Sequence, residues 1–302
     1  MNIPRYVDVN DTDFPSLLRY IPNPPKGIYI NGEMPADNSP KVAIIGSRAC
    51  SEYGIKAAES FAHELAVNGV VVVSGMARGI DAAAHRAAIE ASGKTIAVLG
   101  CGVDVCYPPE HDELMRLIIQ NGCVISEYSP GTKPERYFFP ARNRIISGLC
   151  DGVVVVEANE KSGTSVTANH ALDQGREVFA VPGSIFSKLS RGTNEMIKIG
   201  AVPVTCAADV LHELKLVSRH NTIVKNKNAK NVDFEKIKML APNEKLVYDC
   251  LGLDINGFGV HIDDIINKSG LPAQTIQYTL MNLELRKIAK RLPGNKFTTN
   301  VY

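Results

Sequence analysis

The feature that most constrains this chain is an alternation of short aliphatic runs with helix-length amphipathic segments, which begins at residue 41. The runs lie at 42–45, 70–73, 95–99, 123–125, 153–156, 178–181 and 202–205. Their Val and Ile residues are nearly continuous, which indicates strands buried on both faces. The sequence predicts helices at 53–67, 79–91, 111–120, 141–149, 164–174, 193–199 and 207–214. We therefore predict an α/β fold, a Rossmann-like doubly wound and mostly parallel sheet, over residues 41–217.

Further segments flank this predicted sheet domain. Residues 1–40 are rich in proline, which resists regular helix, so we predict an irregular N-terminal lead-in. Residues 218–241 are polar and basic without an amphipathic period, which indicates a linker. Residues 242–302 carry helical patterns at 243–251, 261–268 and 272–285, followed by a hairpin pattern around a turn at 293–295. Three helices followed by a hairpin is the order of a winged-helix domain, which we predict here.

Composition excludes several classes of protein. Of the 302 residues 45% are hydrophobic and 22% charged, which is ordinary for a globular chain and unlike a disordered or fibrous one. No apolar run approaches the roughly 18 residues that span a bilayer, and the N-terminus lacks the basic start and apolar core of a signal peptide. We therefore expect a cytoplasmic protein without membrane contact. The seven cysteines include no Cys-x-x-Cys pair, which predicts reduced thiols and no metal or other cofactor.

Glycine-rich turns follow three of the predicted strands, at 46–48, 74–81 and 100–102. The carboxyl ends of parallel strands meet at one edge of a sheet, where helix N-termini offer N–H groups to anions. Gly46 lets backbone approach a ligand, Ser47 can donate to a phosphate oxygen, and Arg48 and Arg78 add charge-assisted contacts. Each glycine could equally serve a tight turn alone. The presence of several on one edge favours an anion site.

The common nucleotide motifs are absent. Gly100-x-Gly102 lacks the third glycine of the dinucleotide fingerprint, because Val105 stands in its place. The triplet 93–95, Gly-Lys-Thr, precedes a strand and has Ala88 at the first P-loop glycine position. The sequence therefore does not predict bound NAD or ATP.

Residues 131–144 combine cations with aromatic rings. The cations are Lys133, Arg136, Arg142 and Arg144, and the rings are those of Tyr137, Phe138 and Phe139. Together they can supply phosphate contacts and base-stacking faces, the combination used on single-stranded nucleic acid. A competing interpretation is that the rings anchor a loop in the core while the arginines solvate its outside. The place of Asn143 between two arginines at a helix start favours nucleic-acid binding.

Catalytic constellations are sparse. Asp81 and His85 lie one helical turn apart and could form an acid–base pair or two metal ligands, but no third ligand stands at a recognisable spacing. A helix-terminal carboxylate and a packed histidine explain the pair more simply. Ser162-Gly163-Thr164 could bind another anion or merely cap the helix that follows. We therefore do not expect an enzyme.

Several ordered motifs together resemble the DNA-processing protein A (DprA, or Smf) family, over about residues 14 to 302. They are Gly46-Ser47-Arg48, the segment 74–81 with His85, Gly100-x-Gly102 with Tyr107-Pro108, the segment 126–128, Phe139-Pro140-x-Arg142-Asn143-Arg144, and the segment 175–183. The resemblance implies a homodimeric, cytoplasmic bacterial protein without catalytic activity. It further implies that the protein binds and protects incoming single-stranded DNA in natural transformation and helps to load the RecA recombinase.

The resemblance also implies which residues contact DNA. Arg48, Arg136 and Phe139 are the candidates for direct contact. Gly46, Ser47, Arg142 and Asn143 line the same pocket in the family pattern. The segment 162–168 and His111 depart from that pattern at two helix starts, which affects the expected shape of the pocket more than the fold.

Two other functions stay open. One is a nucleotide-processing, phosphoribohydrolase-like enzyme on the same fold. Such enzymes resemble a Pro-Gly-Gly-x-Gly-Thr-x-x-Glu pattern, but here the preceding glycines are missing and Thr167 stands in the glutamate position. The other is a duplex-binding repressor that uses the winged helix. Its third predicted helix has no basic residue before Arg286 and Lys287, so DNA contacts there would fall to Lys290, Arg291 and Lys296.

The charge balance limits how the sheet domain can bind DNA. Residues 1–220 carry 21 basic and 24 acidic side chains, whereas residues 221–302 carry 12 basic and 8 acidic ones. The sheet domain is therefore acidic overall. Binding there must depend on a few placed arginines and helix N-termini and not on bulk charge.

Overall fold

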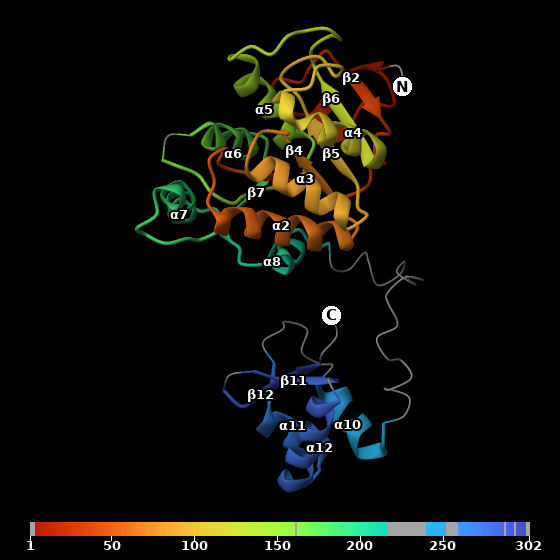
Figure 1. The fold of residues 1–302 in the computed structure, drawn as a ribbon, viewed down its shortest axis with the longest axis vertical. Helices are drawn as coiled ribbons and strands as arrows, with labels where there is room; N and C mark the ends of the chain where they lie inside the picture. Colours follow the sequence, from red (N-terminus) through yellow and green to blue (C-terminus); the bar gives the residue numbers. More distant parts are fainter. Residues whose placement is uncertain are drawn as a thin grey trace. The chain divides into compact units, whose positions relative to one another are not determined.

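The computed structural model describes residues 4–160, 162–216, 240–251, 259–286, 288–292 and 294–299. The chain divides into two units, Met1–Ile223 and Val224–Tyr302 (Figure 1). Apart from Leu240 and Ala241, the predicted linker at 218–241 lies outside the described residues. Within the described parts, no helix is long and apolar enough to cross a bilayer.

The predicted aliphatic runs form the parallel part of a sheet whose strand order is β1-β2-β6-β5-β4-β3-β7-β8-β9. The parallel strands are β3 (Lys41–Ile45), β4 (Val71–Ser74), β5 (Thr95–Val98), β6 (Gly122–Ser126), β7 (Gly152–Val155), β8 (Glu177–Ala180) and β9 (Val202–Pro203). Every residue of β3 to β7 is buried, as expected for strands covered on both faces. The predicted doubly wound sheet is confirmed.

Helices cover both faces of the sheet (Figure 1). One face carries α2 (Glu52–Val67), α3 (Ile80–Glu90), α4 (Asp112–Asn121) and α8 (Ala207–Glu213). The other carries α1 (Ser16–Arg19), α5 (Phe138–Gly148), α6 (Gly163–Asp173) and α7 (Arg191–Lys198). Because side chains alternate along a strand, Val42 and Ile44 of β3 pack in the first layer, while Ala43 and Ile45 pack in the second. Short 3₁₀ turns occur at Pro109–His111 and Lys188–Ser190.

The N-terminal region contradicts the prediction of an irregular lead-in over residues 1–40. Strands β1 (Arg5–Asp8) and β2 (Gly27–Gly32) extend the sheet, with β2 antiparallel to both β1 and β6. Ile28 and Ile30 alternate into the core, where α1 contributes Leu18. The prolines of this region lie outside the strands, in the connections. They interrupt the chain without preventing a regular edge to the sheet.

The strand order reverses beside β3, because β4 to β6 follow on one side and β7 to β9 on the other. Ligands of open α/β sheets bind outside the carboxyl ends of the strands at such a point. The turn after β3 and the segment after β7 meet here, since the Ser47 N–H donates to the Glu157 carbonyl at 2.8 Å. The buried Glu157 carboxylate accepts from the N–H and hydroxyl of Ser51, at 2.9 and 2.6 Å. These bonds fix the start of α2 at the edge of the site.

The second unit is the predicted winged helix. Its elements are α10 (Pro242–Leu251), β10 (Val260–His261), α11 (Ile262–Ser269), α12 (Ala273–Leu285), β11 (Ala289–Leu292) and β12 (Lys296–Thr299). Its core includes Val247, Ile265, Ile276, Leu280 and Phe297. Strand β10, which pairs with β12, was not predicted, because two residues are too few to show a strand period.

Candidate nucleic-acid interface

An open cavity of about 660 Å³ lies at the carboxyl edge of the sheet, where the strand order reverses. Its walls are the turn after β3, the first turns of α5 and the segment that leads into α6. The predicted site residues that line it are Gly46, Ser47, Arg48, Arg136, Phe139, Arg142 and Asn143. The fold therefore brings together residues that lie far apart in the sequence.

Arg48 and Phe139 line this cavity side by side. The Arg48 Cζ atom lies 5.5 Å from the centre of the Phe139 ring, within the range of a cation–π contact. Tyr107 also packs on the Phe139 ring, with 5.3 Å between the two ring centroids. Neither Arg48 nor Arg136 forms a hydrogen bond or ion pair with any described residue, and both side chains are exposed. Their N–H groups can therefore serve phosphate oxygens beside an aromatic stacking face.

The glycines at the strand ends make room for protein side chains. A Cβ atom on Gly75 would lie 2.5 Å from an Arg142 guanidinium nitrogen, and one on Gly100 would lie 3.0 Å from the Phe139 ring. A Cβ on Gly46 would lie 2.6 Å from the Ile80 side chain. Close packing therefore accounts for glycine at these three positions, an explanation that the sequence, which left an anion site or a tight turn open, did not offer. They matter to the site because they let Arg142 and Phe139 reach it.

Arg142 lines the cavity with only the small part of its side chain that is not buried. The side chain is buried, and its Nη1 atom donates to the carbonyl of Gly75 at 2.9 Å and to that of Val98. Burial lowers the pKa of Arg142 to about 10, which leaves it protonated at neutral pH. Arg142 thus joins the ends of β4 and β5 and places a positive charge at the cavity wall. We expect it to position the site more than to contact a ligand.

Among the carboxylates, Asp81 has the largest electrostatic effect on the pKa of Arg142. Its Oδ2 atom accepts from the N–H groups of Gly75, at 3.1 Å, and Ala77, at 3.3 Å. Burial raises the pKa of Asp81, while the positive charge of Arg142 opposes that rise. The carboxylate therefore holds the turn after β4 in place.

Helix α6 begins at the cavity without a side-chain cap. Ser162, Gly163 and Thr164 line the cavity, and the Ser162 hydroxyl makes no capping hydrogen bond. The interpretation of Ser162 as a simple cap is therefore wrong. Asn143 ties the two helices together, because its Nδ2 atom donates to the Gly163 carbonyl at 3.3 Å. The uncapped first turn adds partial positive charge to the site.

Three predicted site residues lie outside the cavity. Arg78 pairs with Glu110 and lines a small adjoining cavity with Arg48. Lys133 is exposed on the loop before α5. Arg144 lies on the other side of α5, paired with Glu127 at 2.7 Å. The prediction that placed Arg144 in the same site as Arg142 does not match its position.

Some lining residues were missed by the reasoning from sequence. Tyr107, Asn159 and Thr167 all line the cavity. Tyr107 carried a usable signal, because an aromatic residue followed by proline stands just after a glycine-rich strand end. Asn159 carried none, since only the parallel packing of β3 and β7 brings it near Ser47.

His85, one helical turn from Asp81, forms no hydrogen bond or ion pair with that carboxylate. His85 is buried, its Nδ1 atom lies 2.7 Å from the Thr95 hydroxyl, and burial lowers its pKa to about 3. Among the described residues, no group of three or more His, Cys, Asp or Glu side chains is placed to hold a metal ion. The seven cysteines are all free thiols.

The winged helix presents few cations on its third helix. Helix α12 contains no Lys or Arg, and it exposes Tyr278, Met281 and Leu285. On the wing, Lys290 is exposed, whereas the Arg291 guanidinium donates to Asn295 at 2.9 Å. Lys287 lies outside the described residues. The helix that would enter a major groove therefore offers no cation to guanine or to phosphates, although its exposed Gln274 and Gln277 carry amide donors.

Fold and site together define a Rossmann-like α/β protein with a cation- and aromatic-lined cavity at its switch point and a winged-helix unit. Residues 5–215 match the family described as DNA recombination-mediator protein A, and residues 238–295 match the DprA winged helix domain. The chain therefore belongs to the DprA family, which confirms the resemblance seen in its motifs.

Named relatives agree with this assignment. DNA processing protein DprA of Streptococcus pneumoniae is 47% identical over 205 residues, covering 68% of this chain and 72% of the relative. Protein Smf of Escherichia coli is 37% identical over 286 residues, covering 94% and 75%. The X-ray structure of the S. pneumoniae protein matches with a TM-score of 0.66 and 44% identity, covering 70% of this chain and 74% of that one. DprA of Helicobacter pylori, studied for its single-stranded DNA binding mode, matches with a TM-score of 0.64 and 32% identity, covering 70% and 97%.

Proposed function

We propose that this chain binds single-stranded DNA at the carboxyl edge of its sheet domain. Arg48 and Arg136 hold phosphates, and Phe139 stacks on a base. The observation that carries the proposal is the Arg48 guanidinium over the Phe139 ring at the mouth of the cavity. The single-stranded DNA binding mode described for the H. pylori relative supports the same ligand.

A single strand fits this site better than a duplex. Stacking on an aromatic side chain needs an unpaired base, which a duplex does not offer. The sheet domain is acidic overall, so it lacks the broad basic surface that holds a double helix by charge alone. Phosphate contacts from a few placed arginines, combined with stacking, suffice for a flexible strand.

The biological role follows from the family. We infer that the protein protects incoming single-stranded DNA in natural transformation and helps to load the RecA recombinase, as a homodimer in the cytoplasm. The description of the family as a recombination mediator and the DNA-processing names of the relatives support this role.

We further propose that the chain acts on DNA without catalysing a reaction. Thr167 lines the cavity at the position where the phosphoribohydrolase pattern has glutamate, and a hydroxyl cannot replace that carboxylate. Asp81, the carboxylate that does line the cavity, is held by backbone N–H groups. Release of free base from nucleoside monophosphates on incubation with the protein would contradict this part of the proposal.

Binding of labelled oligo-dT and of a matched duplex tests the proposal, with fluorescence anisotropy as the readout. We expect the wild type to prefer the single strand, and Arg48→Ala with Arg136→Ala to weaken its binding about 10-fold to 100-fold or more. Arg116→Ala is the matched control, because Arg116 is an exposed arginine on α4 and pairs only with Asp112. Equal binding by the double variant and the control would overturn the proposal.

A further inference from the structure

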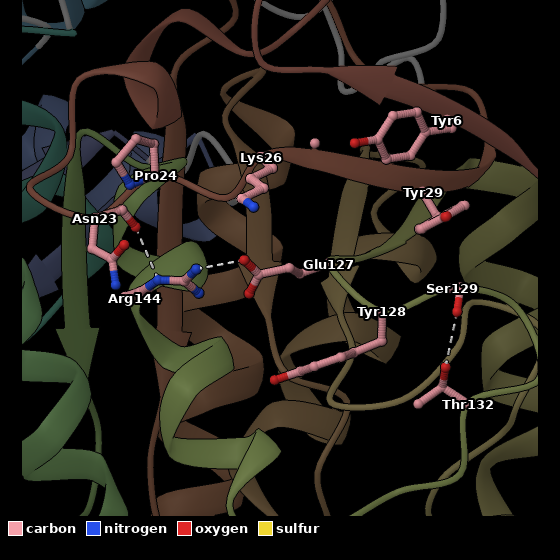
Figure 2. Close-up of a pocket in the computed structure, with 11 residues that line it drawn as sticks. Tyr6, Asn23, Pro24, Lys26, Tyr29, Glu127, Tyr128, Ser129, Thr132 and Arg144 are labelled. Carbon is pink, nitrogen blue, oxygen red and sulfur yellow. Dashed lines mark hydrogen bonds and ion pairs between the residues drawn. The ribbon is translucent and has the colours of Figure 1, made fainter.

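A second cavity, of about 650 Å³, lies on the other side of the first turns of α5. It is lined by Tyr6 of β1, Tyr29 of β2, the connection from Asn23 to Gly27, the segment 127–132 and Arg144. Figure 2 shows the Arg144 guanidinium directed at Glu127 on one side of this cavity and the Tyr6 and Tyr29 rings on the other. The DNA-binding cavity described above shares no residue with it.

The start of α5 is the wall between the two cavities. Phe139 lines the first cavity, whereas its neighbour Phe138 packs on Tyr128 of the second, with 3.9 Å between ring centroids. In the next turn Asn143 faces the first cavity and Arg144 the second. Consecutive residues of one helix therefore line different cavities.

Aromatic rings continue across this wall. Tyr137 is exposed at the top of the wall, and its ring lies 4.5 Å from that of Phe138, which in turn packs on Tyr128. Beyond Tyr128, the half-exposed Tyr6 ring lies 4.9 Å from that of Tyr29. The rings thus form two groups, Tyr137–Phe138–Tyr128 and Tyr6–Tyr29, and the exposed Tyr137 and half-exposed Tyr6 rings offer stacking faces.

The charges of the second cavity suit one phosphate. Arg144 is neutralised by Glu127, through an ion pair that is largely buried. Lys26 is exposed, and its ammonium forms no ion pair with any described residue. The cavity therefore holds one uncompensated cation beside tyrosine rings. Ser129 and Thr132, whose hydroxyls lie 3.3 Å apart, add polar groups on the wall.

From this geometry we propose that the second cavity is a further subsite for the same DNA strand, with a base against Tyr6 and a phosphate on Lys26. This inference rests on the proposed function, because the strand enters from the Arg48 cavity. The chemistry recognised is that of a nucleotide, which either a strand or a free mononucleotide could supply. The experiment separates these two sources.

The test measures affinity against oligo-dT length, from about 4 to about 16 nucleotides. Lys26→Ala and Tyr6→Leu are compared with the wild type, and Lys56→Ala, an exposed lysine on α2, is the charge control. We expect both subsite variants to bind the shortest oligomers normally. On longer ones, Tyr6→Leu should bind about 5-fold to 150-fold more weakly than the wild type. Lys26→Ala should reduce the slope of log K against log salt by about 0.7.

Each alternative outcome is decisive. Normal binding of all lengths by both variants, with unchanged thermal stability, would overturn the subsite. Binding of dTMP that depends on Lys26, with an unaltered length series, would assign the cavity to a free nucleotide and also overturn it. The proposed function is tested separately, because Arg48→Ala with Arg136→Ala should weaken binding of even the shortest oligomers. Failure of the second subsite is therefore distinguishable from failure of DNA binding at the Arg48 cavity.

Discussion

The guanidinium of Arg48 lies over the face of Phe139, with Cζ 5.5 Å from the ring centre. Arg48 follows the first parallel strand and Phe139 lies in the first turn of α5, so only the folded domain brings them together. The contact holds two long side chains in place before a ligand arrives, which lowers the entropy lost on binding. It also sets a cation directly beside a stacking face.

Removal of the Phe139 ring should weaken binding of single-stranded DNA. We expect Phe139→Ala to cost about 1 to 3 kcal/mol, the usual contribution of one base stacked on an aromatic side chain. Phe139→Tyr keeps the ring and should bind nearly as the wild type does. Anisotropy titrations with oligo-dT measure both variants. Equal affinity of the alanine and tyrosine variants would show that no base stacks here.

Arg48→Lys separates charge from shape. Lysine keeps the positive charge but loses the planar fork that can bind a phosphate in bidentate fashion and stack on a ring. We expect weaker binding at every salt concentration with an unchanged salt dependence, because the number of neutralised phosphates stays the same. A lysine variant with wild-type affinity would mean that the contact with Phe139 does not matter.

Gly75→Ala should destabilise the sheet domain by about 1 to 3 kcal/mol, the usual cost of inserting a methyl group into packed structure. The new Cβ would lie 2.5 Å from the buried Arg142 guanidinium. Gly163→Ala is the matched control, because no atom of the described residues lies within 4 Å of its added Cβ. Urea unfolding gives both free energies. A loss of similar size in the control would refute the role of Gly75.

Acid should destabilise the protein through His85. Its pKa falls from 6.5 to about 3 in the folded state because the ring is buried. Between those values the unfolded chain binds the extra proton, so the stability present above about pH 6.5 is lost by about 1.4 kcal/mol per pH unit as the pH falls toward 3. Urea unfolding of the wild type and His85→Gln between about pH 6 and about pH 4 should show a shallower slope in the variant. Parallel slopes would contradict this.

The part of the fold that was predictable from sequence is the set of strands buried on both faces. Strands such as β3 and β7 are covered on both faces, so their continuous Val and Ile runs are an unambiguous signal. Strand β2 was missed because its buried residues, Ile28 and Ile30, alternate with others and stand among prolines. The edge strands thus depend on pairing with β6, a long-range contact that no local pattern shows.

The site was predictable in its residue types but not in its geometry. The basic and aromatic residues around Phe139 are visible as a segment, yet Arg142 and Arg144 lie on different sides of one helix. The period of the predicted helix at 141–149 already separates Arg142 from Arg144, because residues two positions apart face different sides, but only the fold shows which of them faces the cavity. The sequence does not predict the second cavity, because its walls include β1 and β2, which lie in the region predicted to be irregular.

The salt dependence of oligo-dT binding tests the central claim most directly. If Arg48 and Arg136 each neutralise a phosphate, the slope of log K against log salt should be shallower by about 1.4 in Arg48→Ala with Arg136→Ala than in the wild type. Arg116→Ala should keep the wild-type slope, since neither Arg116 nor its ion-pair partner Asp112 lines the cavity. An unchanged slope and affinity in the double variant would show that the DNA strand does not bind in this cavity.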